Sequence, residues 1–241
     1  MKHLLFLSIF SLIFCVSYAQ EKPSDYSNII TTKKLVVKNK KNPTDKPSIY
    51  LIPVVSKKYP KLRNALCDTN LFYGEKLDSV VKEYQNEGMG ISSFSYTITY
   101  INKGIISLKL EYDTMGAYPD ESQRWLTLNI NTGKRYSLNN EIDSKGLKWI
   151  YSTYRTTLNK RILENKDDKN CGDTYNDLKT AIDVLKANEL FKGYVFTKKG
   201  VLVSMEKILP HVVQACEPDR ELLIPYSELK SFKTSTAIVI K

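Results

Sequence analysis

Residues 94–112 decide the fold, and they read Phe-Ser-Tyr-Thr-Ile-Thr-Tyr-Ile-Asn-Lys-Gly-Ile-Ile-Ser-Leu-Lys-Leu-Glu-Tyr. Apolar and polar side chains alternate in residues 94–100 and again in residues 106–112, which is typical of strands with one buried face. The turn sequence Asn102-Lys103-Gly104 between them predicts a β-hairpin. Because an alternating apolar face needs a partner, other parts of the chain must cover this sheet.

More strands and two helices are expected after the hairpin. The expected strands are 126–130, 135–138, 194–196, 201–205 and 221–226, and a loop at 113–124 precedes the first of them. Amphipathic helices are expected from residue 143 or 144 to 165 and from 174 to 190. This order predicts an α+β fold, with a mainly antiparallel sheet and two longer helices packed on one face.

The N-terminus has the three parts of a secretory signal peptide. A positive charge at Lys2 precedes an apolar run over residues 4–16, and Ser17-Tyr18-Ala19 places small residues at a cleavage site. Residues 1–19 are therefore predicted to be removed, and the protein is predicted to be periplasmic or secreted. The later sequence predicts no transmembrane segment.

The rest of the chain is interpreted as two parts. Residues 20–46 are expected to be a lysine-rich linker, with a short edge strand at 34–38 as the alternative, and residues 47–241 a single domain. Within the domain, residues 49–55 predict a strand. Helices are expected at 59–67 and 75–84.

Positive charge is concentrated near the start of the predicted mature chain. The formal net charge is +10, and the nine lysines from Lys33 to Lys61 face one acidic residue, Asp45. Such a run attracts polyanions such as anionic lipid head groups, acidic glycans or nucleic acid. The alternative is a solvated leader that favours solubility. Nothing in the sequence predicts a specific nucleic-acid partner.

Three cysteines follow the predicted signal peptide. An oxidising compartment favours one disulfide among them. Cys171 and Cys216 lie in polar, turn-like sequence and are predicted to pair. Cys67 lies in an apolar helical stretch and is predicted to be a buried thiol.

Little in the sequence predicts catalysis. His211 is the single histidine after residue 19, and the cysteine spacings match no zinc pattern, so neither a metal nor a cofactor is predicted. No Gly-x-Ser-x-Gly elbow is present. Paired carboxylates near the 113–124 loop support an alternative, a hydrolase of cell-wall or surface glycan. The candidates are Glu111, Asp113, Asp120 and Glu121.

The candidate binding residues are mainly aromatic. Tyr112, Tyr118 and Trp125 flank or lie in the expected loop, and aromatic side chains in a loop held by a hairpin suit recognition of carbohydrate or protein. His211 is added as a polar candidate at a strand end. The alternative is that the rings pack on the core.

Several segments, in order, resemble a known envelope domain. They are 106–112, 116–119, 128–138, 193–201, 210–213 and 224–230. They resemble the extracytoplasmic domain of unknown function at the C-terminus of RsiV-type anti-sigma factors and in PdaC-type peptidoglycan deacetylases. The resemblance covers residues 47–232 and implies an extracytoplasmic α+β module that binds something in or near the cell wall.

Departures from the family limit what the resemblance implies. Gly116-Ala117-Tyr118 stands where the family often has Gly-Ala-His. The sequence lacks a sigma-binding segment and a deacetylase domain, so neither role is carried over. We therefore expect a non-catalytic envelope binding module that recognises a protein or a cell-wall glycan.

Overall fold

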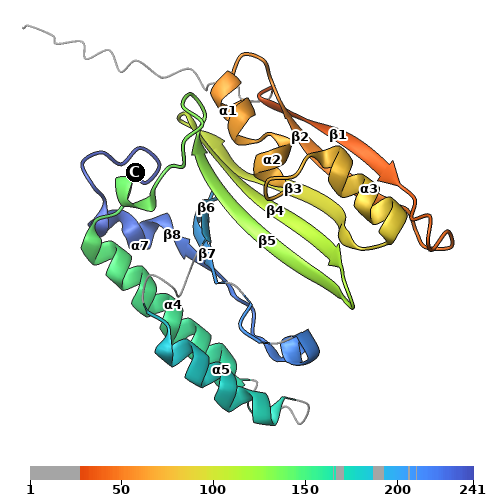
Figure 1. The fold of residues 1–241 in the computed structure, drawn as a ribbon. Helices are drawn as coiled ribbons and strands as arrows, with labels where there is room; N and C mark the ends of the chain where they lie inside the picture. The colour runs from red at the N-terminus through yellow and green to blue at the C-terminus, as the bar shows by residue number, and fades with distance from the viewer. Residues whose placement is uncertain (1–27, 165, 167–170, 187–192, 206, 210) are drawn as a thin grey trace, which may run out of the picture.

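The computed structural model describes residues 28–164, 166, 171–186, 193–205, 207–209 and 211–241. The predicted signal peptide, residues 1–19, lies outside the described residues. The described chain forms a five-stranded sheet, a three-stranded sheet and helices that pack against them (Figure 1). The predicted α+β class is confirmed.

The larger sheet has the strand order β1-β2-β3-β4-β5. Its strands are β1 (Ile30–Val37), β2 (Ser48–Val55), β3 (Gly90–Asn102), β4 (Ile105–Met115) and β5 (Pro119–Asn129). β2 and β3 pair in parallel through Tyr50 and Phe94, and the other neighbours are antiparallel. The sheet is mainly antiparallel, as predicted.

The predicted hairpin at residues 94–112 is formed by β3 and β4. Asn102 pairs with Ile105, so Lys103 and Gly104 make a two-residue loop, with φ of 50° and 75°. Two positive φ values define a turn whose twist matches that of the flanking strands. Glycine adopts this conformation without steric cost, which explains Gly104.

β1 corrects the interpretation of residues 20–46 as a linker and agrees in part with the alternative, an edge strand at 34–38. Its eight residues pair with β2, from Ile30 opposite Val55 to Val37 opposite Ser48. Lys33 and Lys34 are exposed on this edge strand. Lysine on an edge strand hinders pairing with other chains, so a regular strand can have the composition of a solvated segment.

Three short helices cover one face of the larger sheet. They are α1 (Pro60–Ala65), α2 (Asp68–Leu71) and α3 (Leu77–Glu87). The even-numbered side chains of β4, from Ile106 to Tyr112, are buried in one core with Leu77, Val80 and Tyr84 of α3. The alternation of residues 106–112 is therefore the alternation between two faces of this sheet, whereas in β3 an irregularity between Ile98 and Tyr100 places Tyr100 against the other core.

A second sheet lies against the other face. It consists of β6 (Gly193–Phe196), β7 (Gly200–Ser204) and β8 (Glu221–Pro225), paired antiparallel in that order. The two longer helices, α4 (Ser144–Glu164) and α5 (Gly172–Val184), share a second core with this sheet (Figure 1). The prediction of one sheet was wrong, because these strands form a separate one.

Buried hydroxyl groups join the two sheets. Ser107 Oγ accepts a hydrogen bond from the backbone N–H of Phe196 at 3.2 Å, and Thr99 Oγ1 donates to the Phe196 carbonyl at 2.8 Å. Thr127 Oγ1 donates to the carbonyl of Tyr194 at 3.3 Å. These bonds satisfy backbone groups of β6, an edge strand of the smaller sheet.

Two predicted local features were wrong. Residues 135–138 form a single bridge, between Arg135 and Leu128, followed by η1 (Leu138–Asn140) instead of a strand. The expected loop at 113–124 is mostly strand, because β4 continues to Met115 and β5 begins at Pro119. The remaining short elements are η2 (His211–Cys216), α7 (Tyr226–Leu229) and η3 (Lys230–Phe232).

The cysteines follow the prediction in part. Cys171 and Cys216 form a disulfide that ties the start of α5 to the end of η2, which confirms the predicted pair. Cys67 is a free thiol at the start of α2 and is partly exposed, so the prediction of a buried thiol was wrong. Among the described residues, no helix combines the length and apolar character needed to cross a membrane.

Candidate functional site

The structure separates the four predicted binding residues. Tyr112 is buried under α2, where its hydroxyl donates to the Leu71 carbonyl at 2.8 Å and burial raises its pKa. Tyr118 is 67% exposed at the tip of the β4–β5 hairpin. His211 begins η2, and its side chain lies outside the described part of the chain.

Trp125 lies on the opposite face of the sheet from Tyr112. Trp125 pairs with Lys109 and Tyr112 pairs with Ser122, so an odd-numbered and an even-numbered position point in opposite directions. A Cβ atom added to Gly193 would lie 3.1 Å from the Trp125 Cβ, so the start of β6 packs closely on this ring. Trp125 also lines a cavity, which makes it the one predicted aromatic residue that belongs to the candidate site.

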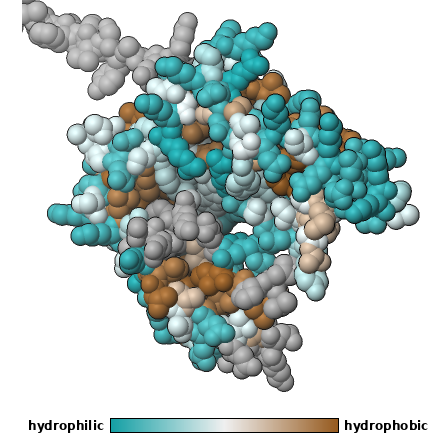
Figure 2. Space-filling view, in the orientation of Figure 1, coloured by the Kyte–Doolittle hydropathy of each residue, from teal (hydrophilic) through white to brown (hydrophobic). Residues whose placement is uncertain are grey.

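This cavity, of about 390 Å³, runs along the outer edge of β5. One wall is the run Asp120–Trp125, and the other includes Ser204, Lys207 and Arg220. Two adjoining hollows of about 530 and 440 Å³ share Glu121, Lys207 and Gln214. We call these three connected hollows the β5 groove. Figure 2 shows the surface hollowed between the larger sheet and the part that contains α4 and α5, with hydrophilic residues beside the hollow.

The β5 backbone faces this groove with hydrogen-bonding groups. At the far end of β5, the Thr127 carbonyl accepts from Tyr136 N, and Asn129 N donates to the Lys134 carbonyl. Odd-numbered residues of β5 therefore direct their N–H and C=O groups away from β4. The same alternation directs the backbone groups of Gln123 and Trp125 into the groove. Within the described chain, β4 is the partner strand along this part of β5.

Ion pairs hold the groove walls together. Lys207 Nζ lies 2.5 Å from Asp120 Oδ1 and donates to Gln214 Oε1 at 3.0 Å. On the sheet face beside the groove, Lys109 Nζ lies 2.6 Å from Glu221 Oε1. These contacts join β4 and the hairpin tip to the segments around η2 and β8.

Glu217 fixes the segment that carries Lys207. Its side chain is 4% exposed, and its Oε1 atom accepts hydrogen bonds of 2.5 Å from the backbone N–H groups of Ile208 and Leu209. Arg220 Nε lies 3.4 Å from the other carboxylate oxygen. This wall of the groove is therefore held by a buried charge that is itself hydrogen-bonded.

The carboxylates considered for hydrolysis have partners of their own. Ser93 Oγ donates to Asp113, and Ser95 Oγ donates to Glu111 Oε2 at 3.1 Å. Asp120 pairs with Lys207, and Glu121 lines the groove. Across the described residues, no group of three or more His, Cys, Asp or Glu side chains is placed to hold a metal ion.

Several groove residues were not predicted from the sequence. They include Gln123, Arg124, Ser204, Lys207 and Arg220. No alternation pointed to them, because Arg124 and Trp125 interrupt the apolar–polar pattern of the third predicted strand at its N-terminal end. Lys207 and Arg220 lie far along the chain from β5, and no local pattern connects them to it.

The fold and its edge groove define an α+β domain with an open cleft at the margin of a mixed sheet. No family model matches the chain, and no curated protein matches it. The fold is similar to that of a DUF3298 family protein from Pseudomonas aeruginosa PAO1, with a TM-score of 0.50, 13% identity, and coverage of 86% of this chain and 94% of that one. A DUF3298 family member from Bacteroides fragilis aligns with a TM-score of 0.48, 15% identity, and coverage of 86% and 93%. At such identities, the similarity concerns the fold alone.

Proposed function

We propose that the protein is an exported, non-catalytic binding module that takes up an extended segment of a partner protein in the β5 groove. The proposal rests on one observation: Gln123 and Trp125, whose backbone groups the strand alternation directs away from β4, line a cavity beside this edge strand. An extended peptide that adds to a sheet edge gains its affinity from such groups, and the surrounding pockets give specificity.

The dimensions of the groove suit this mode of binding. Six consecutive residues, Asp120–Trp125, line it. At about 3.3 Å per residue they present an edge roughly 20 Å long. Charges of both signs lie beside this edge, with Glu121 and Arg124 on β5 and Arg220 opposite, so polar side chains of a bound segment have partners.

An extracytoplasmic location is part of the proposal. The disulfide between Cys171 and Cys216 supports an oxidising compartment, since disulfides are rare in reducing ones. The sequence pattern of residues 1–19 and the resemblance to the RsiV-type and PdaC-type envelope domain point the same way. A periplasmic or secreted protein with a partner in the envelope is therefore the setting we infer.

Binding is favoured over hydrolysis because the candidate carboxylates already have hydrogen-bond or ion-pair partners within the protein. Glu111 and Asp113 accept hydrogen bonds from serines of β3, and Asp120 pairs with Lys207. A general acid or nucleophile must be available to the substrate. Because Glu111, Asp113 and Asp120 have these partners, we assign them structural roles in and beside the walls of the β5 groove.

The experiment compares two substitutions at one position. Proline at Gln123 removes the N–H that faces the groove and leaves the bonds to β4 in place, because proline is tolerated where an edge N–H faces outward. Gln123→Val changes the side chain and keeps the N–H. Peptides are selected against the native protein from a random display library, and their affinities for both variants are measured by calorimetry.

We expect Gln123→Pro to weaken binding of the selected peptides about tenfold or more, the equivalent of one lost hydrogen bond, and Gln123→Val to have a smaller effect. Equal binding by the two variants would overturn the strand-addition mode. In parallel, the native protein is incubated with purified cell wall. Release of reducing sugar or muropeptide would contradict the non-catalytic assignment. If the library yields no binding peptide but the protein is retained on the wall, a glycan ligand is favoured.

A further inference from the structure

The geometry points to a second site, an oxyanion pocket between α1, the turn after β5 and the side chains of β5, which binds the acidic groups of an anionic glycan. The pocket has a volume of about 520 Å³. Four of its lining residues are charged, and all four are basic. They are Lys61, Arg124, Lys134 and Arg135, and the two arginines also line the neighbouring β5 groove. Two neutral amide side chains, Asn64 and Asn70, lie beside them.

The charges of this pocket have no acidic neighbours among the described residues. None of the four cations has a described carboxylate oxygen within the 4.0 Å that defines an ion pair. Like charges lining one concave surface raise the local positive potential and concentrate anions there. Arginine and lysine are also the usual donors to phosphate, sulfate and carboxylate groups.

The pocket walls are held in place by packing and hydrogen bonds. Gly133 has φ of 66°, and a Cβ atom there would lie 2.3 Å from the Lys61 carbonyl oxygen, so the turn is in direct contact with α1. Asn129 Oδ1 accepts from the backbone N–H groups of Asn131 and Thr132 and from Thr132 Oγ1. A preformed site loses less conformational entropy on binding.

Arg124 is also fixed before any ligand arrives. Its Nη1 atom donates to the Asn70 carbonyl at 2.5 Å, and its guanidinium carbon lies 5.8 Å from the centre of the Tyr73 ring. Asn70 in turn donates to the Asn64 carbonyl at 2.8 Å. The guanidinium is therefore oriented by neutral groups, which do not offset its positive charge at the pocket.

The fold also divides the lysine run from Lys33 to Lys61. Because β1 and β2 are antiparallel, the lysines of the connecting segment lie at one end of the strand pair and Lys57, Lys58 and Lys61 at the other. An eight-residue strand separates the two ends by roughly 25 Å. In the connecting segment, Lys41 pairs with Glu87 at 3.3 Å.

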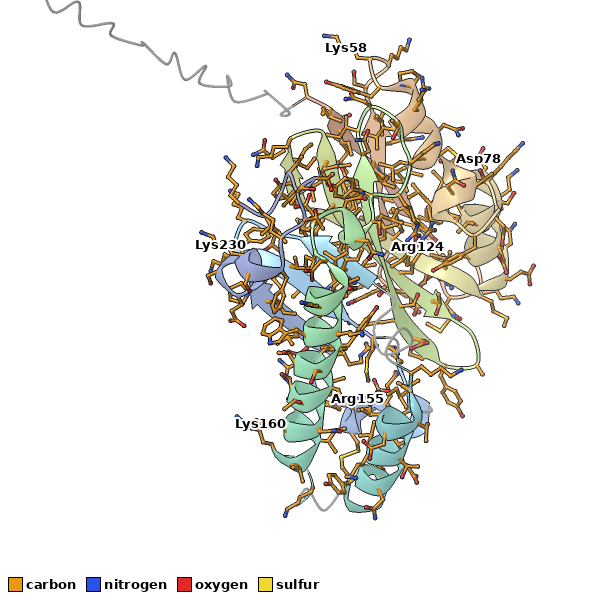
Figure 3. All side chains as sticks on the ribbon, turned by 90° about the vertical axis from the view of Figure 1, so that its left-hand side faces the viewer. Lys58, Asp78, Arg124, Arg155, Lys160 and Lys230 are labelled. Carbon is orange, nitrogen blue, oxygen red and sulfur yellow. A yellow bond between two sulfur atoms is a disulfide. The ribbon has the colours of Figure 1, made fainter. Side chains whose placement is uncertain are left out.

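The proposed anion site is therefore set by which cations the fold brings together, and not by the sequence of lysines from Lys33 to Lys61. Lys61 is the residue of the run that lines the pocket, and the other cations come from β5 and the turn after it. Figure 3 shows Lys58 at the surface and Arg124 further in, on β5. An open pocket of this volume accommodates more than one small ion, so an acidic polymer fits it better than free phosphate.

The test uses heparin as a defined acidic glycan and compares two charge reversals of equal size. Lys61→Glu with Lys134→Glu alters the pocket. Lys33→Glu with Lys34→Glu, at two exposed positions of β1, is the matched control on the same basic chain. Both doubles change the net charge by the same amount, and Lys61 and Lys134 do not line the β5 groove. Peptide binding in the groove therefore reports separately on the proposed function.

We expect the pocket variant to lose roughly tenfold or more in heparin affinity at low salt, and the control to lose much less. Equal losses would mean that net charge governs binding, and would overturn the pocket. The milder Lys61→Gln with Lys134→Gln variant must show a loss in the same direction, and thermal unfolding confirms that each variant is folded. A titration with inorganic phosphate completes the test. If phosphate binds as tightly as heparin, the assignment to a polymer is wrong.

Discussion

Lys207 Nζ lies 2.5 Å from Asp120 Oδ1 and thereby joins the segment after β7 to the tip of the β4–β5 hairpin. The two residues are 87 positions apart in the chain, and both line the β5 groove. The ion pair is partly exposed, so solvent screens it. Its effect is therefore expected on the local mobility of the hairpin more than on global stability.

Lys207→Ala is expected to change the free energy of unfolding by less than about 1 kcal/mol and to speed amide exchange at the hairpin tip, residues 116–120. Hydrogen exchange followed by mass spectrometry measures the second effect. Lys179→Ala, which removes a helical pair with Asp183, is the control and should leave the hairpin unchanged. An unchanged tip in Lys207→Ala would show that the pair does not restrain the groove.

Ser107→Ala should lower the free energy of unfolding by about 1–3 kcal/mol, because it leaves the buried N–H of Phe196 without its acceptor. Ser107 also contacts Thr127 at 2.9 Å, so a double-mutant cycle with Thr127→Val should show non-additive losses. Chemical denaturation measures both. Ser227→Ala, at an exposed site, is the control. Strictly additive losses would contradict a shared hydroxyl network between the sheets.

Glu141 is fully buried and binds the C-terminal segment. Its carboxylate accepts hydrogen bonds from the backbone N–H groups of Ile238, Val239 and Ile240, all at 2.9 Å, and from the Tyr136 hydroxyl at 2.6 Å. Glu141→Gln replaces an acceptor oxygen with a donor, and should cost about 2–3 kcal/mol of unfolding free energy. Glu164→Gln, at the exposed end of α4, should cost little. If the two substitutions lowered the unfolding free energy by similar amounts, Glu141 would not be what holds the C-terminal segment in place.

Reduction of the disulfide is expected to destabilise the protein by about 4 kcal/mol, the loop-entropy value for the 45-residue separation of Cys171 and Cys216. Because η2 carries Gln214, peptide binding in the β5 groove should weaken as well. Thermal unfolding and calorimetry with and without reductant measure these effects. A Cys171→Ser, Cys216→Ser variant with native stability would contradict the expectation.

Cys67 should alkylate in the folded protein at a lower pH than an ordinary cysteine. A hydrogen bond with Thr69 Oγ1, at 3.3 Å, is the main cause of the lowered pKa of its thiol. The thiolate is the reactive form, so the alkylation rate should reach half its maximum at a lower pH in the folded protein than in the unfolded chain. Thr69→Val should move that midpoint upward. A midpoint that stays the same in this variant would rule out the Thr69 bond as the cause.

The sequence predicted the fold best where alternation was regular. Residues 94–112 alternate over both strands, and the hairpin lies where it was expected. β1 was harder to predict, because an edge strand exposes lysine and threonine like a linker does. The division into two sheets depends on buried hydroxyls such as Ser107 and Thr127, which have the same sequence signature as residues on a solvent-exposed face.

The candidate site could be predicted in one part. Trp125 was identified as a binding residue, and it lines the β5 groove. Tyr112 was identified with it, but Tyr112 points to the other face of the sheet and is buried in the core there. A loop was expected between the two residues, so the sequence did not show on which face of the sheet each would lie. Lys207 pairs with Asp120, and the backbone of Lys61 contacts the turn at Gly133. Both contacts join segments that are far apart in the chain. Such contacts have no local sequence signal.

The most direct measurement is residue-resolved amide exchange by NMR, in the free protein and with a selected peptide bound. In the free protein, the amides of Gln123 and Trp125 should exchange much faster than those of Arg124 and Leu126, which face β4. Bound peptide should slow the first pair by tenfold or more and leave the second pair nearly unchanged. If Gln123 and Trp125 are already protected in the free protein, or remain unprotected in the complex, the edge of β5 is not where the partner binds.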